Sequence, residues 1–342
     1  MTTTDGARHR VLMTGRASAD WRERYRALTP PEFELVWVDQ EGAAPAELER
    51  ALAGVEFCYG TLPVEWLPRA PRLRLIQQGG VGYVDAFVTA ARDHRVPVAI
   101  TPEGTCLGVA EHTILLILAV YKHLAEAHAT MRAGGWDHER FRRDSYFFYG
   151  KTLGIVGLGR IGTDVARRAR GFEPARVLYH DLFRKPPQAE RELGVEFAGL
   201  DALLRAADVV TLHVFLSEAS HHLIGERELG LMKPSAVLIN TSRGAVVDEA
   251  ALYRALRDER IWGAGIDAWT QEPTPADNPL RGLPNVTCTP HMATGTVDAD
   301  RMKFEAAIAN FQRVLAGAPP RNVVRPYAEV IAGGPGSTSG GG

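Results

Sequence analysis

The sequence has no apolar run long enough to cross a membrane. Its longest, residues 114–121, is flanked by Glu111, His112 and Lys122, whereas a spanning helix needs about 20 apolar residues. Residues 1–10 are polar and charged, so we expect no secretory signal either. These features predict a protein of the cytoplasm that has no membrane partner.

The sequence also has few cysteines and little net charge. Cys58, Cys106 and Cys288 are widely separated and odd in number, which argues against a disulfide framework and fits a reducing compartment. They show no metal-ligand spacing, and the adjacent His221 and His222 cannot share an ion, so we predict no metal site. The formal net charge is −2, which gives no general attraction to nucleic acid.

What the sequence does contain is a regular alternation of strand-like and helix-like segments. Its 342 residues are enough for two domains, and alternation predicts an α/β architecture with parallel sheets covered by helices on both sides. The first series of strands is predicted at residues 11–14, 33–38, 57–59, 74–77 and 96–100. The second series is predicted near Val177, Val195, Val209, Val237, Gly265 and Val286.

Three other segments complete this organisation. One long amphipathic helix is predicted over residues 107–132, between the two series of strands. A final helix is predicted over residues 298–316. The glycine- and serine-rich tail, residues 331–342, has almost nothing to bury and is predicted to be disordered.

The most informative segment is a glycine-rich turn between a strand and a helix, Gly157-x-Gly159-x-x-Gly162. Gly157 permits the sharp turn, Gly159 lets the backbone approach a diphosphate, and Gly162 allows the helix to pack on the strand. The helix opens at Arg160 and Ile161, where unpaired N–H groups and the positive end of the helix dipole would bind the diphosphate. The segment predicts a dinucleotide-binding site, against the alternative of a glycine-rich loop that merely turns.

The cofactor is expected to be NAD. A second strand, residues 176–180, ends at Asp181, where a carboxylate can accept hydrogen bonds from the adenosine ribose. This carboxylate would face the 2′-phosphate of NADP, and like charges repel at short range unless they are compensated. Arg184 and Lys185 are near enough in sequence to compensate, so NADP stays as the less favoured alternative.

Three residues that are suited to catalysis or to anion binding each follow one of the last three predicted strands. They are Arg243, Glu272 and His291, and ligands bind at the carboxyl ends of strands in open α/β sheets. An arginine suits bidentate binding of a carboxylate. A histidine suits proton exchange with a carbonyl or hydroxyl group, and a nearby glutamate favours the protonated imidazole.

Each of these residues has a plainer alternative. Arg243 could cap the sheet or pair with Asp248, Glu272 could be an exposed acid in a turn, and His291 could be a loop histidine with local hydrogen bonds. Two histidines of the long helix, His112 and His123, are interpreted as packing or polar-face residues.

Several segments together resemble the NAD-dependent D-isomer-specific 2-hydroxyacid dehydrogenase family. They are residues 109–113, 157–162 with Asp181, 240–244, 246–249, 267–273 and 290–294, within a likeness that covers residues 10–325. The resemblance implies two doubly wound parallel-sheet domains. A flavodoxin-like substrate domain, residues 1–103 and 294–330, would hold an inserted Rossmann domain, residues 104–293, that binds NAD. It also implies a homodimer, with contacts from the long helix and the aromatic stretch 136–149.

Carried over by position, the resemblance assigns roles around a substrate. Arg243 would anchor its carboxylate, His291 would act as the general acid beside the nicotinamide, and Glu272 would be the partner of His291. The backbone amides of three residues would hold the other carboxylate oxygen. These residues are Gly80, Val81 and Gly82.

The resemblance also assigns roles around the cofactor. Asp267 would contact the nicotinamide carboxamide, Thr241 would line the ring, and Thr113 would lie near the phosphates. Relatives usually carry His-x-Pro-Leu where this chain has His213-Val-Phe-Leu216. Phe215 would therefore take the place of a proline that fixes the backbone close to the adenine.

The implied reaction is hydride transfer between NAD(H) and C2 of a small 2-hydroxy or 2-oxo acid, such as the reduction of glyoxylate or hydroxypyruvate. Three alternatives stay open. One is an NADH-sensing regulator that has the scaffold without catalysis. Another is a biosynthetic dehydrogenase for an unusual acid such as a phosphonate, which the atypical loop at Tyr83 would permit. The third is a relative that oxidises an inorganic or one-carbon anion such as phosphite or formate; formate-oxidising relatives carry glutamine in place of Glu272, which disfavours formate.

Overall fold

The chain folds as two compact units. The computed structural model describes residues 8–14, 17–38, 44–326 and 329. The first unit contains Met1–Thr105 and Thr296–Gly342, and the second, Cys106–Gly295, is inserted between these two segments. The sequence predicted the junctions after residues 103 and 293, and the two units divide two residues later in each case. The tail predicted to be disordered lies outside the described residues.

The first unit is a flavodoxin-like sheet with helices on both faces. Its strands are β1 (His9–Met13), β2 (Phe33–Trp37), β3 (Val55–Tyr59), β4 (Leu75–Gln77) and β5 (Val98–Ala99). Its helices are α1 (Ala19–Leu28), α2 (Pro45–Ala53), η1 (Val64–Arg69), α3 (Asp85–Asp93) and α12 (Val297–Leu315). The strands are parallel in the order β2-β1-β3-β4-β5, which is the order of flavodoxin-like sheets.

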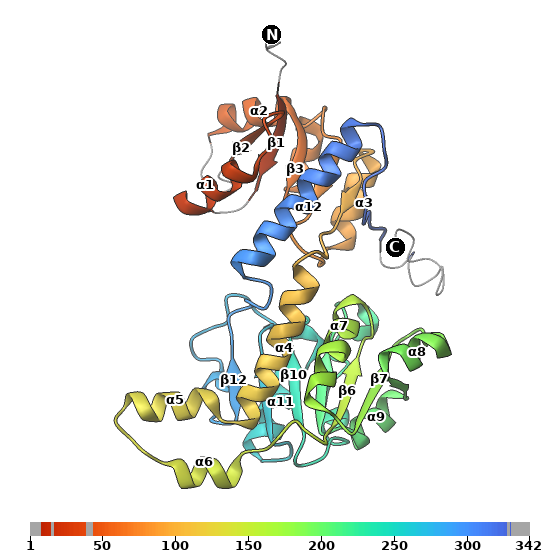
Figure 1. The fold of residues 1–342 in the computed structure, drawn as a ribbon. Helices are drawn as coiled ribbons and strands as arrows, with labels where there is room; N and C mark the ends of the chain where they lie inside the picture. The colour runs from red at the N-terminus through yellow and green to blue at the C-terminus, as the bar shows by residue number, and fades with distance from the viewer. Residues whose placement is uncertain (1–7, 15–16, 39–43, 327–328, 330–342) are drawn as a thin grey trace. The chain divides into compact units, whose positions relative to one another are not determined.

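Alternate side chains of the first sheet fill two cores, because successive residues of a strand point to opposite faces. Val11 of β1 packs in the core that contains Phe304 and Phe311 of α12. Leu12 packs in the other core, with side chains of α2, η1 and α3. The helix near the end of the chain therefore covers a sheet that is made entirely from the first hundred residues (Figure 1).

The second unit is a Rossmann sheet, also parallel and covered on both faces. Its strands are β6 (Thr152–Val156), β7 (Arg176–His180), β8 (Glu196–Phe197), β9 (Val209–Leu212), β10 (Val237–Asn240), β11 (Gly263–Ile266) and β12 (Val286–Cys288). Their order is β12-β11-β10-β9-β6-β7-β8. The longer elements between them include α7 (Arg160–Ala169), α8 (Pro187–Leu193), α9 (Leu200–Ala206) and α11 (Glu249–Arg257). Residues of α4 (Thr105–Tyr121) and α7 share one core with the sheet, and residues of α9 and α11 share the other.

The prediction of one long helix over residues 107–132 is wrong. The structure has α4 and then α5 (Leu124–Arg132), bent by 63°. The break is at His123, which has φ 49° and whose Nε2 lies 3.1 Å from the carbonyl oxygen of Asp144. A further helix, α6 (His138–Asp144), follows, and Figure 1 shows α5 and α6 extending away from the sheet of this unit.

Among the described residues, no single helix has both the length and the hydropathy of a membrane span. The bent pair of α4 and α5 meets that test only when the two helices are taken together.

Candidate active site

The glycine turn lies where the order of the Rossmann sheet reverses. β6 pairs with β7 on one side and with β9 on the other, and open α/β sheets bind ligands outside the strand ends at such a switch point. Gly157 follows β6 with φ 92°, and a Cβ atom there would lie 2.7 Å from the carbonyl oxygen of His213, which follows β9. Only glycine fits between these two strand ends without a shift.

The other two glycines differ in what surrounds them. A Cβ atom at Gly162 would lie 2.1 Å from the carbonyl oxygen of Gly157, so α7 packs directly against the turn. A Cβ atom at Gly159 would meet nothing within 4 Å, so the backbone is open there. α7 begins after Gly159 without a side-chain cap. Its first N–H groups, at Arg160 and Ile161, are therefore placed as an anion site at a helix N-terminus would need them.

Asp181 stands at the end of β7, beside the turn. Its Oδ2 accepts a hydrogen bond from the N–H of Leu158 at 2.7 Å, which links the acid to the glycine turn. Arg184 is held elsewhere, since its Nε and one terminal nitrogen donate to the two oxygens of Glu190 at 2.9 and 3.0 Å. This pairing lowers the pKa of Glu190 to about 2. Arg184 also lies over the ring of Phe197.

His213, which follows β9 beside the glycine turn, has an uncharged ring. Among the described residues, neither ring nitrogen has a hydrogen-bond partner, and both are buried although part of the residue is accessible. Burial lowers the pKa of His213 to about 3, so the ring carries no charge near neutral pH. Phe215, two residues on, is 39% exposed, and its carbonyl oxygen accepts a hydrogen bond from Ser220.

The predicted catalytic residues come together at three neighbouring strand ends. Strands β10, β11 and β12 are adjacent and in register, and they are followed by Arg243, Glu272 and His291 respectively. His291 Nδ1 lies 2.8 and 2.7 Å from the two oxygens of Glu272. A carboxylate only accepts, so Nδ1 carries a hydrogen and Nε2 is the atom left for proton exchange with a ligand.

Arg243 belongs to the same group. Burial lowers its pKa below the usual value, and the charge of Glu272 opposes that shift, so Glu272 acts electrostatically on the guanidinium and is in hydrogen-bond contact with the imidazole. One terminal nitrogen of Arg243 donates to the carbonyl oxygen of Ser242 at 2.7 Å. The alternative partner, Asp248, accepts a hydrogen bond from the N–H of Ala251 and caps α11.

The loop of His291 is organised by a buried carboxylate. Asp267 has no exposed surface, and its oxygens accept hydrogen bonds from the N–H groups of Met292 and Ala293 at 2.9 and 3.0 Å and from the hydroxyl of Thr289 at 2.6 Å. The N–H of His291 donates to the carbonyl oxygen of Asp267 at 2.9 Å. In this structure the carboxylate holds the histidine loop, and its contact with a carboxamide stays a prediction.

His112 has a role that could not be predicted from the sequence. Its Nε2 lies 3.0 Å from the Thr289 hydroxyl oxygen and 3.5 Å from Asp267 Oδ1, and burial lowers the pKa of this histidine. No local signal could reveal these partners, because they are more than 150 residues away in sequence. His112 thus supports the loop of His291 from α4.

Two threonines predicted near the cofactor are in contact with each other. The hydroxyl oxygens of Thr113 and Thr241 are 3.0 Å apart, and Thr113 also donates to the carbonyl oxygen of Val109. Both side chains are buried, so their place near a phosphate and a nicotinamide ring stays a prediction. The residues predicted to bind the substrate carboxylate through their backbone amides lie in the first unit, shortly after β4; they are Gly80, Val81 and Gly82.

Comparison with known proteins agrees with these features. Residues 114–293 match the family described as D-isomer specific 2-hydroxyacid dehydrogenase, NAD binding domain. Over 312 residues, the chain is 39% identical to a glyoxylate reductase of Korarchaeum cryptofilum, covering 88% of this chain and 92% of that protein.

Solved structures agree as well. A protein from Thermus thermophilus is similar with a TM-score of 0.78 and 35% identity, over 92% of this chain and 99% of that one. An NADPH-dependent glyoxylate/hydroxypyruvate reductase from Sinorhizobium meliloti is similar with a TM-score of 0.76 and 28% identity, over 93% and 97%. With its two parallel sheets and its glycine turn, the chain belongs to the D-isomer specific 2-hydroxyacid dehydrogenase family.

Proposed function

We propose that this protein reduces C2 of a small 2-oxo acid, with glyoxylate as the first candidate, and uses NADH as the reductant. The observation that carries the proposal is the contact of His291 with Glu272, which also acts electrostatically on Arg243. An acid, its partner and a carboxylate anchor are the groups that this reduction needs. Relatives named glyoxylate reductase support the choice of substrate.

Each group has a defined chemical task in this proposal. The bound nicotinamide would supply the hydride that C2 receives. Arg243 would bind the substrate carboxylate through two parallel N–H···O bonds. His291 would donate a proton from Nε2 to the carbonyl oxygen as that oxygen gains charge, and Glu272 would stabilise the positive ring that donates it.

We further propose NAD rather than NADP as the cofactor. Membership of the family does not decide this, because the Sinorhizobium relative is NADPH-dependent. Asp181 would accept hydrogen bonds from the ribose hydroxyls and would repel a 2′-phosphate. Two nearby cations, Arg184 and Lys185, could compensate this repulsion, and the guanidinium of Arg184 is occupied by Glu190. Of the two, Lys185 would then be left to balance a 2′-phosphate beside the acid.

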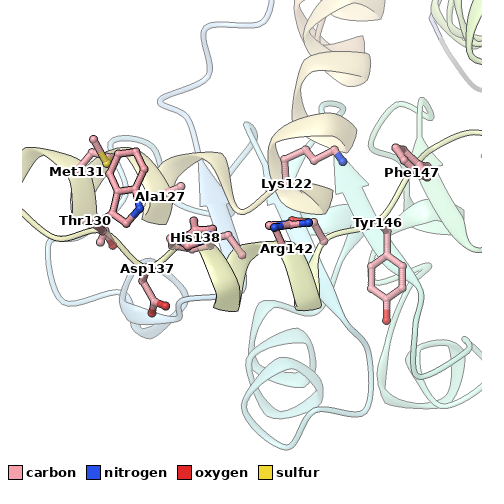
Figure 2. A pocket seen from close by; sticks show the side chains of 12 residues that line it. Lys122, Ala127, Thr130, Met131, Asp137, His138, Arg142, Tyr146 and Phe147 are labelled. Carbon is pink, nitrogen blue, oxygen red and sulfur yellow. The ribbon is translucent and has the colours of Figure 1, made fainter.

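We also propose that two copies associate through α5 and α6. Large apolar side chains are exposed in these helices and in the segments beside them, including Met131 at 54%, Trp136 at 73% and Phe147 at 73%. Figure 2 shows side chains of α5, of α6 and of the segment that follows around one pocket of about 550 Å³. Exposed apolar surface of this kind marks a protein interface. The cytoplasmic location stays a prediction of the sequence.

The function is tested by an assay of the purified protein with NADH and NADPH against glyoxylate, hydroxypyruvate, pyruvate, branched and aromatic 2-oxo acids, and phosphonates. We expect reduction of one or more small 2-oxo acids, with NADH preferred. His291→Asn should lower kcat by a factor of about 100 or more, since general acid catalysis contributes 10²–10⁴-fold. His94→Asn, an exposed histidine at the end of α3, is the matched control.

Other results would overturn different parts of the proposal. Tight NADH binding without turnover of any acid would overturn the proposal in favour of an NADH-sensing regulator. Turnover of phosphonates alone would replace the substrate class. Full activity in His291→Asn would remove this histidine from the mechanism.

A further inference from the structure

The turn after β4 is held by buried polar side chains that come from three distant parts of the chain. Gln77 ends β4, Thr101 follows β5, and Asn310 lies in α12. Their side chains are almost completely buried, with exposed fractions of 1%, 0% and 5%. Burial of polar groups costs free energy unless they are hydrogen-bonded. The hydrogen-bond partners of these three side chains therefore explain how polar residues can be buried at this position.

The hydrogen bonds form one chain that ends at the turn. The N–H of Arg321 donates to Asn310 Oδ1 at 2.8 Å, and Asn310 Nδ2 donates to Gln77 Oε1 at 2.7 Å. Gln77 Nε2 donates to the hydroxyl of Thr101 at 2.7 Å. That hydroxyl donates in turn to the carbonyl oxygen of Gln78 at 2.5 Å.

The direction of this chain is fixed at its start. A backbone N–H can only donate, so Asn310 must present its oxygen to Arg321 and its amide nitrogen to Gln77. Gln77 must then accept with Oε1 and donate with Nε2 to Thr101. All bonds run in the same sense, and hydrogen bonds in series strengthen one another. The hydroxyl hydrogen of Thr101 is thereby directed at the carbonyl oxygen of Gln78.

Thr101 holds two peptide groups of the turn. Its hydroxyl binds the carbonyl oxygen of Gln78, and its backbone N–H binds the carbonyl oxygen of Gly80 at 2.9 Å. The C=O and N–H of a trans peptide group point in opposite directions. The N–H groups of Gly79 and Val81 must therefore point away from Thr101.

The N–H groups of this turn are available to a ligand. Within the part of the chain that the structure describes, no hydrogen bond is seen from the N–H groups of residues 79–82. Neighbouring backbone donors without acceptors form a concave site for an anion. Apolar side chains would be enough to stabilise this core, since replacing a buried polar pair by well-packed apolar groups is often neutral. This chain of hydrogen bonds has a further effect, because it orients the turn after β4.

We propose that Thr101 is a positioning residue for substrate binding. Held by Gln77 and Asn310, it sets the direction of the N–H groups of Gly79 and Val81, in the turn that would receive the carboxylate of the substrate. This inference rests on the proposed function for the identity of the anion. It predicts that loss of the Thr101 hydroxyl weakens binding of the carboxylate and leaves NADH binding unchanged.

The test compares Thr101→Val, which keeps the shape of the side chain, with Thr101→Ser, which keeps the hydroxyl. Thr29→Val is the matched control, because it also removes a hydroxyl that donates to a backbone carbonyl, at 2.6 Å to Tyr25. The readouts are KM and kcat for glyoxylate, the Kd of NADH, and the Kd of oxamate for the NADH complex by calorimetry. Oxamate carries the carboxylate next to an amide carbonyl that is not reduced.

We expect Thr101→Val to raise KM for glyoxylate and Kd for oxamate about tenfold, the effect of one hydrogen bond to a charged group. Thr101→Ser should stay near the wild type, as should Thr29→Val. Gln77→Met breaks the chain one step earlier and should give a smaller rise in both constants. It serves as the test if Thr101→Val does not fold by circular dichroism.

Unchanged binding of oxamate in a folded Thr101→Val or Gln77→Met variant would overturn the inference. An equal weakening of NADH and oxamate binding would reduce Thr101 to a structural residue. If the wild type binds oxamate but reduces no 2-oxo acid, the proposed function fails, and the ratio of oxamate Kd values still tests Thr101. If the wild type neither binds oxamate nor reduces a 2-oxo acid, both proposals fail.

Discussion

His291 has a backbone conformation that few residues other than glycine adopt. Its φ is 50°, in the left-handed region, where a side chain costs about 1–3 kcal/mol unless the surroundings hold it. Asp267 provides that hold, because it accepts from the N–H groups of residues 291, 292 and 293 through its carbonyl and carboxylate oxygens. The strain and the proposed catalytic role therefore fall on the same residue.

The proposed preference for NAD depends on Glu190, because its charge keeps Arg184 in a bidentate pair. Glu190→Gln removes that charge and should free the guanidinium, so that NADPH binds about threefold or more tightly than to the wild type while NADH is unaffected, an effect typical of one exposed charge pair. The measurement is fluorescence titration of both dinucleotides.

Glu192→Gln is the matched control, since it neutralises a glutamate of the same helix that accepts from Gln188. If the ratio of NADPH to NADH affinity stays the same in Glu190→Gln, Arg184 has no part in cofactor choice.

At the scale of elements, the two parallel sheets could be predicted because each buried strand has an apolar run followed by a turn. The break between α4 and α5 could not be predicted. Both helices read as one apolar pattern, and the left-handed turn at His123 is fixed by a contact with residue 144. Helix α6 was missed for a related reason, because none of its residues is buried and a helix without an apolar face has no period to detect.

The exposed apolar side chains of α5, α6 and the segment after them bear on assembly. Changing both Trp136 and Phe147 to serine should weaken association of two copies at least about 30-fold, the effect of one residue that dominates an interface. Sedimentation velocity over a range of concentrations measures this.

Val64→Ser is the control, since it removes an apolar side chain of the first unit that is 43% exposed. It should leave the association of two copies unchanged. A wild type that is monomeric at high concentration, or a double variant as dimeric as the wild type, would contradict this interface.

For the whole molecule, the candidate site could be predicted from the sequence before its geometry was known. The residues that could be singled out each follow a predicted strand, and strand ends are where such sheets bind ligands; they are Gly157, Asp181, Arg243, Glu272 and His291. The supporting residues were not found. His112, Thr101 and Asn310 act through partners far along the chain, and a single sequence carries no signal for such contacts.

The central claim is that Arg243 binds the carboxylate of the substrate while the glycine turn binds the cofactor. The most direct test is the KM for glyoxylate and the Kd for NADH in Arg243→Gln, with Arg205→Gln, an exposed arginine of α9, as the control. We predict a rise in KM of about 100-fold, as for loss of a buried partner of a charge, with the Kd of NADH within about threefold of the wild type. An unchanged KM, or NADH binding weakened as much as KM, would contradict the assignment of Arg243.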